Sequence, residues 1–321
     1  MAQDFSPSDS ALGLVNGLYS PGMAQQMVWL SGLLTFGQCV EVFERIGGCR
    51  VSCSSLWRRV QTDGERLVAT LQSHQAQISP ERLQLGAASA DHEGVKGVSM
   101  DGGMVNIRGE GWKEVKVGAV YDVALRLEKD ERSGEYVDMA HAQNTSYTAV
   151  LGDVEAFEPA LWALAVRHKV PTARHSSVTA DGTEWIWNIS ADLFPDSSQI
   201  VDYYHAADHL AQAATALYPD DPKRAQQWLH QRQDDLFLGQ IHAITTSLDN
   251  ADLTEQSHYF HTHQRRMQYH EFRENGLPIG SGTVESGVKQ FKTRLTAAGM
   301  RWNRPGAVLD NSFNALSAAA A

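Results

Sequence analysis

Three acidic residues that lie far apart in the sequence stand where a folded chain could present them to a ligand. Asp101 follows the apolar run of KGVSMD, Asp181 closes SSVTAD, and Glu285 stands near the start of GTVESGVKQF. Carboxylates that meet at one point repel each other unless cations lie between them. The set therefore predicts, if the fold brings it together, a pair of Mg²⁺ or Mn²⁺ ions about 3.5–4 Å apart, which is the arrangement that supports phosphoryl transfer.

The glycines that follow Asp101 leave two interpretations open. A strand can deliver one side chain to the edge of a sheet, and Gly102 and Gly103 would keep the space beside it open for a ligand. Asp-Gly is also among the commonest signals of a hairpin turn, so these residues alone do not decide between a site and a turn.

The elements that must position these carboxylates can be inferred from hydrophobic periodicity. Extended patterns alternate with helical ones in the order of three strands, a helix, a strand, a helix and a strand. The expected strands are 96–101, 114–127, 135–142, 176–181 and one that begins at 198, and the expected helices are 146–169 and 184–194. This order predicts an α/β fold with a mixed sheet and helices on both faces, in which the first and fourth strands can be neighbours.

Residues 205–276 are rich in Ala, Leu, Gln and His and lack strand-like alternation, which predicts an all-helical insertion into the α/β unit. A last helix follows, with Ser281 or Thr283 as its cap. Its apolar stripe consists of Val284, Val288, Phe291 and Leu295. Glu285 lies off this stripe in the first turn, and Lys289 and Lys292 share the face of Glu285.

Composition bounds the class of protein. The 321 residues are 42% hydrophobic and 20% charged, which is typical of a globular protein with a large core. No run is long and apolar enough for a membrane span, and the first ten residues are polar and acidic, so we expect a cytoplasmic protein that does not contact membranes. Cys39, Cys49 and Cys53 form no C-x-x-C pair, which fits a reducing compartment and offers no zinc knuckle.

The net charge of −11 argues against a protein that coats nucleic acid non-specifically. The average hides an asymmetry, because residues 277–321 carry five Lys and Arg against two Asp and Glu. The basic excess therefore follows Glu285 in the chain.

The N-terminal part offers a second possible contact with DNA. Residues 34–62 are expected to form two helices around a Gly-Gly break, with Ser52 or Ser54 capping the second. Arg58 and Arg59 would then lie on the recognition helix of a helix-turn-helix. A plain helical hairpin explains the same pattern, and the choice stays open.

Several blocks of the sequence taken together carry a specific resemblance. SMDGG, GWKEVKVGAVYD, TADGTEWIW, IVDYYHAADHL, LPIGSGTVESGVKQF and GMRWNRPGA resemble, in this order, blocks of DDE-type transposases of bacterial insertion sequences, specifically the ISKra-type group. The resemblance runs from about residue 95 to 306 and extends more weakly into the N-terminal part.

The resemblance implies a ribonuclease-H-like mixed sheet flanked by helices, interrupted by the helical insertion and preceded by a small helical domain. The implied parts are 1–90, the core 91–204, the insertion 205–276 and the last core helix with a basic tail 277–321. Asp101, Asp181 and Glu285 match the family's two aspartates and glutamate, which hold two metal ions. Asp202 and His205 match an accessory D-x-x-H motif.

What the resemblance implies about partners follows from the same motifs. The substrates would be DNA, namely the terminal inverted repeats of the element and the target, cut by water and then joined by the liberated 3′ hydroxyl. A homodimer or larger assembly on DNA is expected. Lys289 and Lys292 would contact phosphates beside the metal site, and further DNA contacts would come from Arg294, Arg301 and Arg304. A solvated basic helix explains the same five residues.

Other interpretations compete with this one. The chain could be a shortened, non-catalytic DNA-binding derivative of such a transposase, acting through residues 34–62 and the basic tail. Asp202, His205 and His209 could instead hold zinc for a hydrolase. Asp202 also fits a helix N-cap, and both roles can coexist. The histidines His258, His261, His263 and His270 are expected on a solvated helix.

Overall fold

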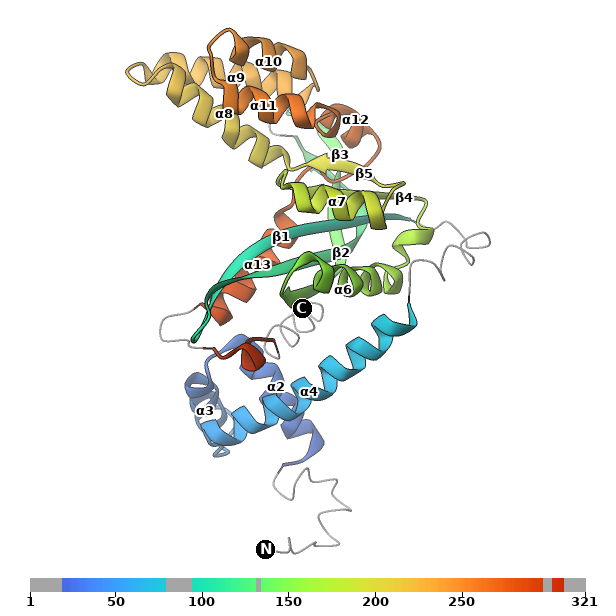
Figure 1. The fold of residues 1–321 in the computed structure, drawn as a ribbon, viewed down its shortest axis with the longest axis vertical. Coiled ribbons are helices and arrows are strands. Elements are labelled where there is room, and N and C mark those ends of the chain that lie inside the picture. Colours follow the sequence, from blue (N-terminus) through green and yellow to red (C-terminus); the bar gives the residue numbers. More distant parts are fainter. Residues whose placement is uncertain (1–18, 79–93, 131–133, 297–301, 309–321) are drawn as a thin grey trace, which may run out of the picture.

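A mixed sheet forms the centre of the molecule. The computed structural model describes residues 19–78, 94–130, 134–296 and 302–308. Within these ranges the strands are β1 (Val95–Ile107), β2 (Gly111–Lys129), β3 (Tyr136–Leu151), β4 (His175–Ala180) and β5 (Ser198–Val201). They form one five-stranded sheet in the order β3-β2-β1-β4-β5 (Figure 1). β2 is antiparallel to β1 and β3, whereas β1, β4 and β5 run parallel to one another.

Helices cover both faces of this sheet. One face packs on α6 (Val154–Arg167) and α7 (Glu184–Leu193), with the short η2 (Val170–Thr172) between them in the chain. The other face packs on α13 (Gly282–Leu295), and the expected stripe of Val284, Val288, Phe291 and Leu295 is buried there. The chain is therefore an α/β protein with a mixed sheet between helical layers, as the periodicity predicts.

A block of helices lies between β5 and α13 in the chain and forms one end of the molecule (Figure 1). Its members are α8 (Tyr203–Leu217), α9 (Pro222–Phe237), α10 (Ile241–Asp249), α11 (Thr254–His263), η3 (Gln264–Arg266) and α12 (Tyr269–Glu274). Apolar side chains of this block, such as Leu236, Ile244 and Phe260, belong to the same buried cluster as the residues of α6 and α7. The insertion is thus packed on the sheet through a continuous core.

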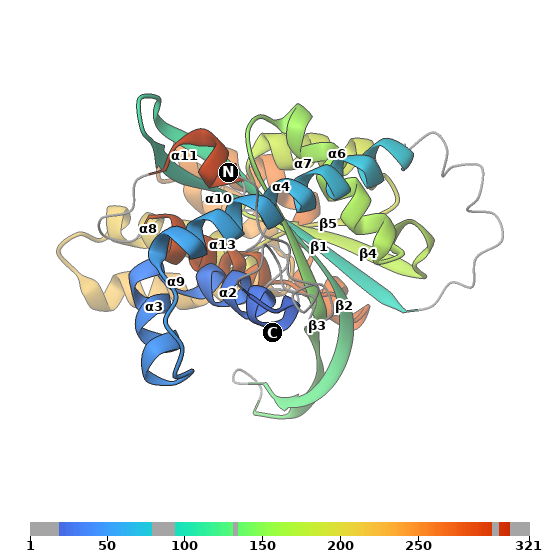
Figure 2. The same cartoon turned by 90° about the horizontal axis from the view of Figure 1, so that it is seen from below.

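The N-terminal helices lie at the opposite end. They are α2 (Pro21–Leu33), α3 (Phe36–Arg45) and α4 (Cys53–Gln77), and they surround a small core of their own that includes Met27, Phe43 and Leu56. Ser52 caps α4 by accepting a hydrogen bond from the Ser55 N–H, as one of the two expected caps. Viewed from below, α4 is seen along its length (Figure 2), and it contacts α6 of the central layer.

Two expectations about strand length were wrong. β1 does not end at Asp101 but continues to Ile107, because Gly102 and Gly103 remain in the ladder opposite Lys116 and Val115 of β2. An Asp-Gly turn therefore does not form at this point. Instead, β1 and β2 extend as a long hairpin beyond the layer that β4 and β5 provide.

β3 is likewise longer than expected, because residues 146–151 are strand and not the beginning of a helix. Tyr147, Ala149 and Leu151 alternate toward α13 and are buried, which is the period-two pattern of a strand. The helix α6 starts only at Val154, where Asp153 accepts a hydrogen bond from the Ala156 N–H, and it continues through Pro159.

In the ranges that the structure describes, no helix combines the length and the apolar character needed to cross a bilayer.

Candidate functional site

The sheet register brings the two aspartates to the same edge. β1 and β4 run in parallel, and their last recorded pair is Ser99 with Thr179. Asp101 and Asp181 each lie two residues beyond this pair, so the aspartates stand side by side at the carboxyl ends of neighbouring parallel segments. The sequence expectation that the first and fourth strands adjoin is confirmed.

Asp101 lies on the face of the sheet that α13 covers. Its backbone partner Val117 belongs to the buried cluster under α13, and successive strand residues point to opposite faces. The Asp101 carboxylate is half-buried and accepts a 2.6 Å hydrogen bond from the Gly102 N–H. The side chain is therefore fixed against its own backbone and directed toward the helix that carries Glu285.

The charges of Asp181 and Glu285 both act on the pKa of Asp101. Burial raises this pKa most, and the negative charges of Asp181 and Glu285 raise it further. The Gly102 N–H and the ammonium of Lys292 act in the opposite direction. The ionised form of Asp101 is therefore disfavoured here, and a bound cation would favour it.

Asp181 is held by the turn that follows β4. Its Oδ1 accepts hydrogen bonds from the Thr183 N–H at 2.9 Å and from the Thr183 hydroxyl at 2.8 Å. Gly182 has φ +114°, a conformation that L side chains rarely adopt, and this allows the chain to leave the strand sharply. The Tyr259 hydroxyl donates to the Asp181 carbonyl oxygen at 3.2 Å. The second aspartate is thus positioned from its own turn and from the insertion.

Glu285 reaches the same region from the first turn of α13. Its side chain is 48% exposed, and its Oε2 lies 3.9 Å from Lys289 Nζ. Its Oε1 accepts a hydrogen bond from the Ser281 hydroxyl at 3.1 Å. The Lys292 side chain lies beside Gly103, since a Cβ placed on that glycine would stand 3.4 Å from Lys292 Cε. Lys292 therefore packs at ordinary contact distance over Gly103, two residues after the first aspartate.

Asp202 is placed differently from the other three carboxylates. Its side chain is buried, with only 1% of the residue exposed, and it accepts hydrogen bonds from the backbone N–H groups of His205 and Ser281. The N-cap role expected for Asp202 is confirmed. The His205 side chain is exposed, and its ring lies 5.5 Å from that of His209.

Two insertion residues beside Asp181 were missed by the sequence analysis. Tyr259 stacks on His209 with a 3.9 Å centroid separation, and its hydroxyl is the donor to Asp181 described above. His263 is buried at 6% exposure, so its expected position on a solvated face was wrong. Its Nε2 would stand 3.3 Å from a Cβ on Gly182. The available signal was their spacing, since residues four apart on a helix such as α11 share one face.

The protonation of His263 follows from its neighbours. Burial lowers the pKa of His263 to about 4, and the positive charge of Arg266 contributes in the same direction. The Arg266 guanidinium lies 3.2 Å from His263 Nδ1. Because arginine can only donate, Nδ1 is the acceptor and the neutral ring carries its proton on Nε2, toward Gly182.

The basic residues expected to contact DNA fall into different settings. Lys289 and Lys292 lie on α13 beside the carboxylates. Arg304 is exposed but bound to both oxygens of Glu110 near the tip of the β1–β2 hairpin, with Nε 3.1 Å from each. Arg301 lies outside the described residues, as does the side chain of Arg294.

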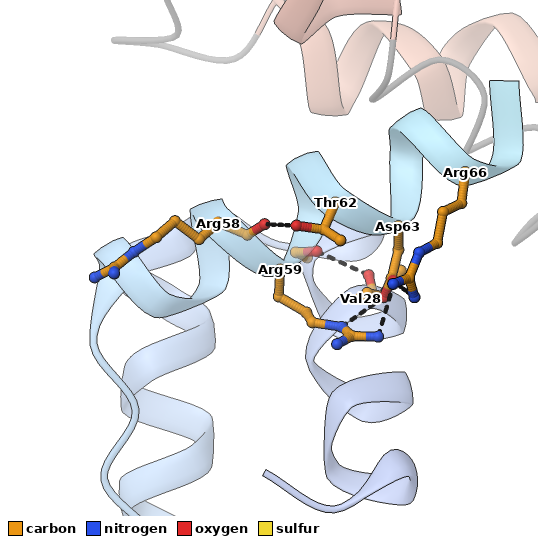
Figure 3. Close-up of polar contacts among 7 residues, drawn as sticks. Val28, Arg58, Arg59, Thr62, Asp63 and Arg66 are labelled. Carbon is orange, nitrogen blue, oxygen red and sulfur yellow. Dashed lines mark hydrogen bonds and ion pairs between the residues drawn. The ribbon is translucent and has the colours of Figure 1, made fainter. Parts of the chain in front are cut away.

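Arg58 and Arg59 on α4 also differ from each other (Figure 3). Arg58 is exposed and donates from Nε to the Ser54 carbonyl oxygen at 3.2 Å. Arg59 forms two hydrogen bonds with Asp63, at 2.6 and 2.8 Å, and its side chain is only 15% exposed. The charge of Arg59 is therefore compensated within the helix, while that of Arg58 faces solvent.

The carboxylate site fits hard cations by its donor chemistry. Asp101, Asp181 and Glu285 offer oxygen ligands, and Mg²⁺ commonly takes one or two protein carboxylates together with waters and substrate phosphates. In the described part of the chain no three His, Cys, Asp or Glu side chains are arranged to hold one ion by themselves. A cation bound here would need ligands from water and substrate in addition to these carboxylates.

The same observation bears on the zinc alternative. Asp202 uses its carboxylate for backbone N–H groups, and His209 stacks on Tyr259. Asp202, His205 and His209 are not arranged as a zinc site among the described residues.

No protein-family model matches the chain, and no curated protein matches it.

Proposed function

We propose that the chain is a DDE-type DNA transposase that resembles the ISKra-type group and performs metal-dependent phosphoryl transfer. The observation that carries the proposal is that Asp101 and Asp181 stand side by side at one edge of the sheet, while the charges of Asp181 and Glu285 both raise the pKa of Asp101. These residues come from β1, the end of β4 and α13, and all three offer oxygen ligands.

The strand order and directions support a ribonuclease-H-like interpretation of the sheet. The order β3-β2-β1-β4-β5, with only β2 antiparallel to the others, is compatible with the mixed sheet that the resemblance implies. Ligands of open α/β sheets bind outside the carboxyl ends of parallel strands, and both aspartates stand two residues beyond the last parallel pair of β1 and β4.

The residues of the chain have distinct tasks in this proposal. Asp101, Asp181 and Glu285 would hold two Mg²⁺ or Mn²⁺ ions, which when bound activate the attacking oxygen and stabilise the leaving oxygen. Lys289 and Lys292 would bind the phosphates of the DNA strand beside the site. Lys292 lies beside Gly103, and the turn at Gly182 presents Asp181 at the edge.

The reaction consists of two displacements at phosphorus. In the first, the oxygen of water attacks a phosphodiester at the element end, and the bond to the 3′ oxygen breaks to release a 3′ hydroxyl. In the second, that 3′ oxygen loses its proton and attacks a target phosphodiester, and the bond to a target 3′ oxygen breaks. We place this reaction in the cytoplasm and expect a homodimer or larger assembly that holds two DNA ends, both on the ground of the resemblance.

The proposal is tested by nicking of a DNA fragment that contains this coding sequence with its natural flanks, in the presence of Mn²⁺. We expect cleavage near the element ends, and its loss in Asp101→Asn and in Glu285→Gln. Glu271→Gln, an exposed acidic residue on α12, is the matched control and should cleave normally. Cleavage that is undiminished in either site variant would falsify the proposal.

A further inference from the structure

One buried carboxylate lies where the helical insertion leaves the sheet and where it returns. Asp202 follows β5 and starts α8, and Ser281 stands immediately before α13. Asp202 Oδ2 accepts a hydrogen bond from the Ser281 N–H, and Oδ1 accepts one of 2.9 Å from the His205 N–H. The two ends of the insertion are therefore joined through a single side chain.

Further backbone contacts fix Asp202 to the segment that carries the second aspartate. The Asp202 N–H donates to the Ala180 carbonyl at 2.7 Å, and Ala180 immediately precedes Asp181. The next residue, Tyr203, donates from its N–H to the Ile279 carbonyl at 2.8 Å. A buried carboxylate is costly unless hydrogen bonds satisfy it, and here each oxygen has a backbone donor.

Ser281 connects Asp202 to Glu285 through two hydrogen bonds. It occupies the N-cap position of α13 but makes no side-chain capping bond. Its hydroxyl donates instead to Glu285 Oε1 at 3.1 Å, and Ser281 itself is buried at 6% exposure. The N–H of Ser281 is therefore held by Asp202 while its hydroxyl orients the glutamate.

We infer that Asp202 is a positioning residue for Glu285, acting through Ser281, and not a ligand of the ions. This inference rests on the proposed function, since it assigns a role at the same site. The N-cap bond accounts for an aspartate three residues before position 205, and it requires only the backbone N–H at that position. His205 contributes its backbone N–H, and its exposed ring lies outside this chain of contacts.

Three variants separate the steps. Asp202→Asn keeps the size of the side chain but replaces one acceptor oxygen with a donor. Ser281→Ala removes the hydroxyl that reaches Glu285 and keeps the N–H that Asp202 holds, whereas Ser281→Thr keeps both. Asp221→Asn is the matched control, because Asp221 is also an N-cap aspartate, of α9, at an exposed position.

The main measurement is Mn²⁺ binding to the full chain without DNA, by titration that yields affinity and stoichiometry separately. We expect affinity about 10- to 100-fold weaker in Asp202→Asn and in Ser281→Ala, which is the usual effect of removing a partner that orients a metal ligand. Stoichiometry should not change, and Ser281→Thr and Asp221→Asn should match the wild type. A merely structural role would lower the fraction of binding-competent protein and leave the affinity of the remainder unchanged, which would overturn the inference.

Amide hydrogen exchange of metal-free protein supplies a second measurement that does not depend on ion binding. The Ser281 amide should exchange faster in Asp202→Asn and at the wild-type rate in Ser281→Ala. Unchanged exchange in Asp202→Asn overturns the inference whatever the ions do. A wild-type chain that binds no Mn²⁺ removes the proposed function instead, so the two failures are distinguishable.

Discussion

Gly287 of α13 lies directly against the ring of Tyr147 on β3. A Cβ on Gly287 would stand 2.4 Å from Tyr147 Cε1, and the Tyr147 hydroxyl donates to the Thr283 carbonyl at 3.0 Å. The absence of a side chain at Gly287 thus lets the helix that bears Glu285 approach the sheet closely.

Gly287→Ala is therefore expected to destabilise the protein by about 1–3 kcal/mol through overpacking. In an unobstructed helix the same change would be stabilising, because alanine has the higher helix propensity. Gly282→Ala, in the same helix with nothing within 4 Å of its Cβ, is the control. Urea unfolding of the two variants compares them, and equal stability would contradict the close approach.

The pKa of Asp101 predicts a pH dependence of stability. This pKa is raised in the folded state by burial and by Asp181 and Glu285, so the native chain binds more protons than the unfolded chain above the ordinary value. Stability without metal must then fall as pH rises through this window. Asp101→Asn should therefore raise the melting temperature of metal-free protein at pH 7, with a gain that shrinks toward pH 4. Asp138→Asn, at an exposed position of β3, should give no such gain.

Mn²⁺ extends this prediction. The ion should raise the melting temperature of the wild type, because it binds the folded state, and should have little effect on Asp101→Asn. Equal stabilisation of both proteins would argue that Asp101 is not a ligand.

The pKa of His263 predicts that stability changes with pH in the opposite direction. Its pKa is lowered to about 4 by burial and by Arg266, so between pH 4 and 6.5 the unfolded chain binds more protons than the folded one. Stability is present above pH 6.5 and is lost as the pH falls through this window. His263→Gln should flatten that loss, whereas His258→Gln, at an exposed position, should not. Tryptophan fluorescence is a suitable probe, since the rings of Trp187 and His263 are 6.1 Å apart.

The setting of Lys289 and Arg304 predicts different effects on DNA binding. Lys289 is 78% exposed on its side chain, and its ammonium is 3.9 Å from Glu285, so Lys289→Ala should weaken binding and lower the salt-dependence slope by about one. Arg304 is already paired with Glu110, so Arg304→Ala should change the slope less. Fluorescence anisotropy across a salt series measures both slopes, and a larger change for Arg304→Ala would show that this ion pair opens on DNA.

Of the two arginines of α4, Arg58 is expected to affect DNA affinity and Arg59 the stability of the fold. Arg58→Ala should reduce affinity for DNA without changing the melting temperature, because Arg58 faces solvent. Arg59→Ala should cost up to about 1 kcal/mol of stability, because it removes the ion pair with Asp63. If Arg58→Ala binds DNA as the wild type does, α4 is part of a plain helical hairpin and not a recognition helix.

Periodicity predicted the elements that form the site but not their lengths. The apolar stripe of α13 and the adjacency of the first and fourth strands followed from local sequence pattern. The sequence alone therefore suggested that Asp101, Asp181 and Glu285 face the same edge of the sheet. The continuation of β1 through Gly102 and Gly103 could not be predicted, because the local sequence Asp-Gly-Gly is as compatible with a turn as with a strand. What decides is the pairing with Lys116 and Val115, which is a property of the sheet.

Contacts made by the insertion were beyond prediction for a related reason. Tyr259 and His263 reach the turn after Asp181 from a helix many residues later in the chain, and only the packing of α11 brings them there. Asp202 could be predicted as an N-cap, since capping is local. Its bond to the Ser281 N–H could not, because that bond depends on where the insertion returns.

The hydrogen bond between the Tyr203 N–H and the Ile279 carbonyl also bears on how much this chain can vary. The segment between these residues starts and finishes at one place, so its length is not dictated by any span it must cover. The entropy of closing a longer or shorter loop between fixed ends changes only with the logarithm of its length. Residues added at an exposed turn of this segment, away from the core it shares with α6 and α7, should therefore leave the arrangement of the sheet and α13 unchanged.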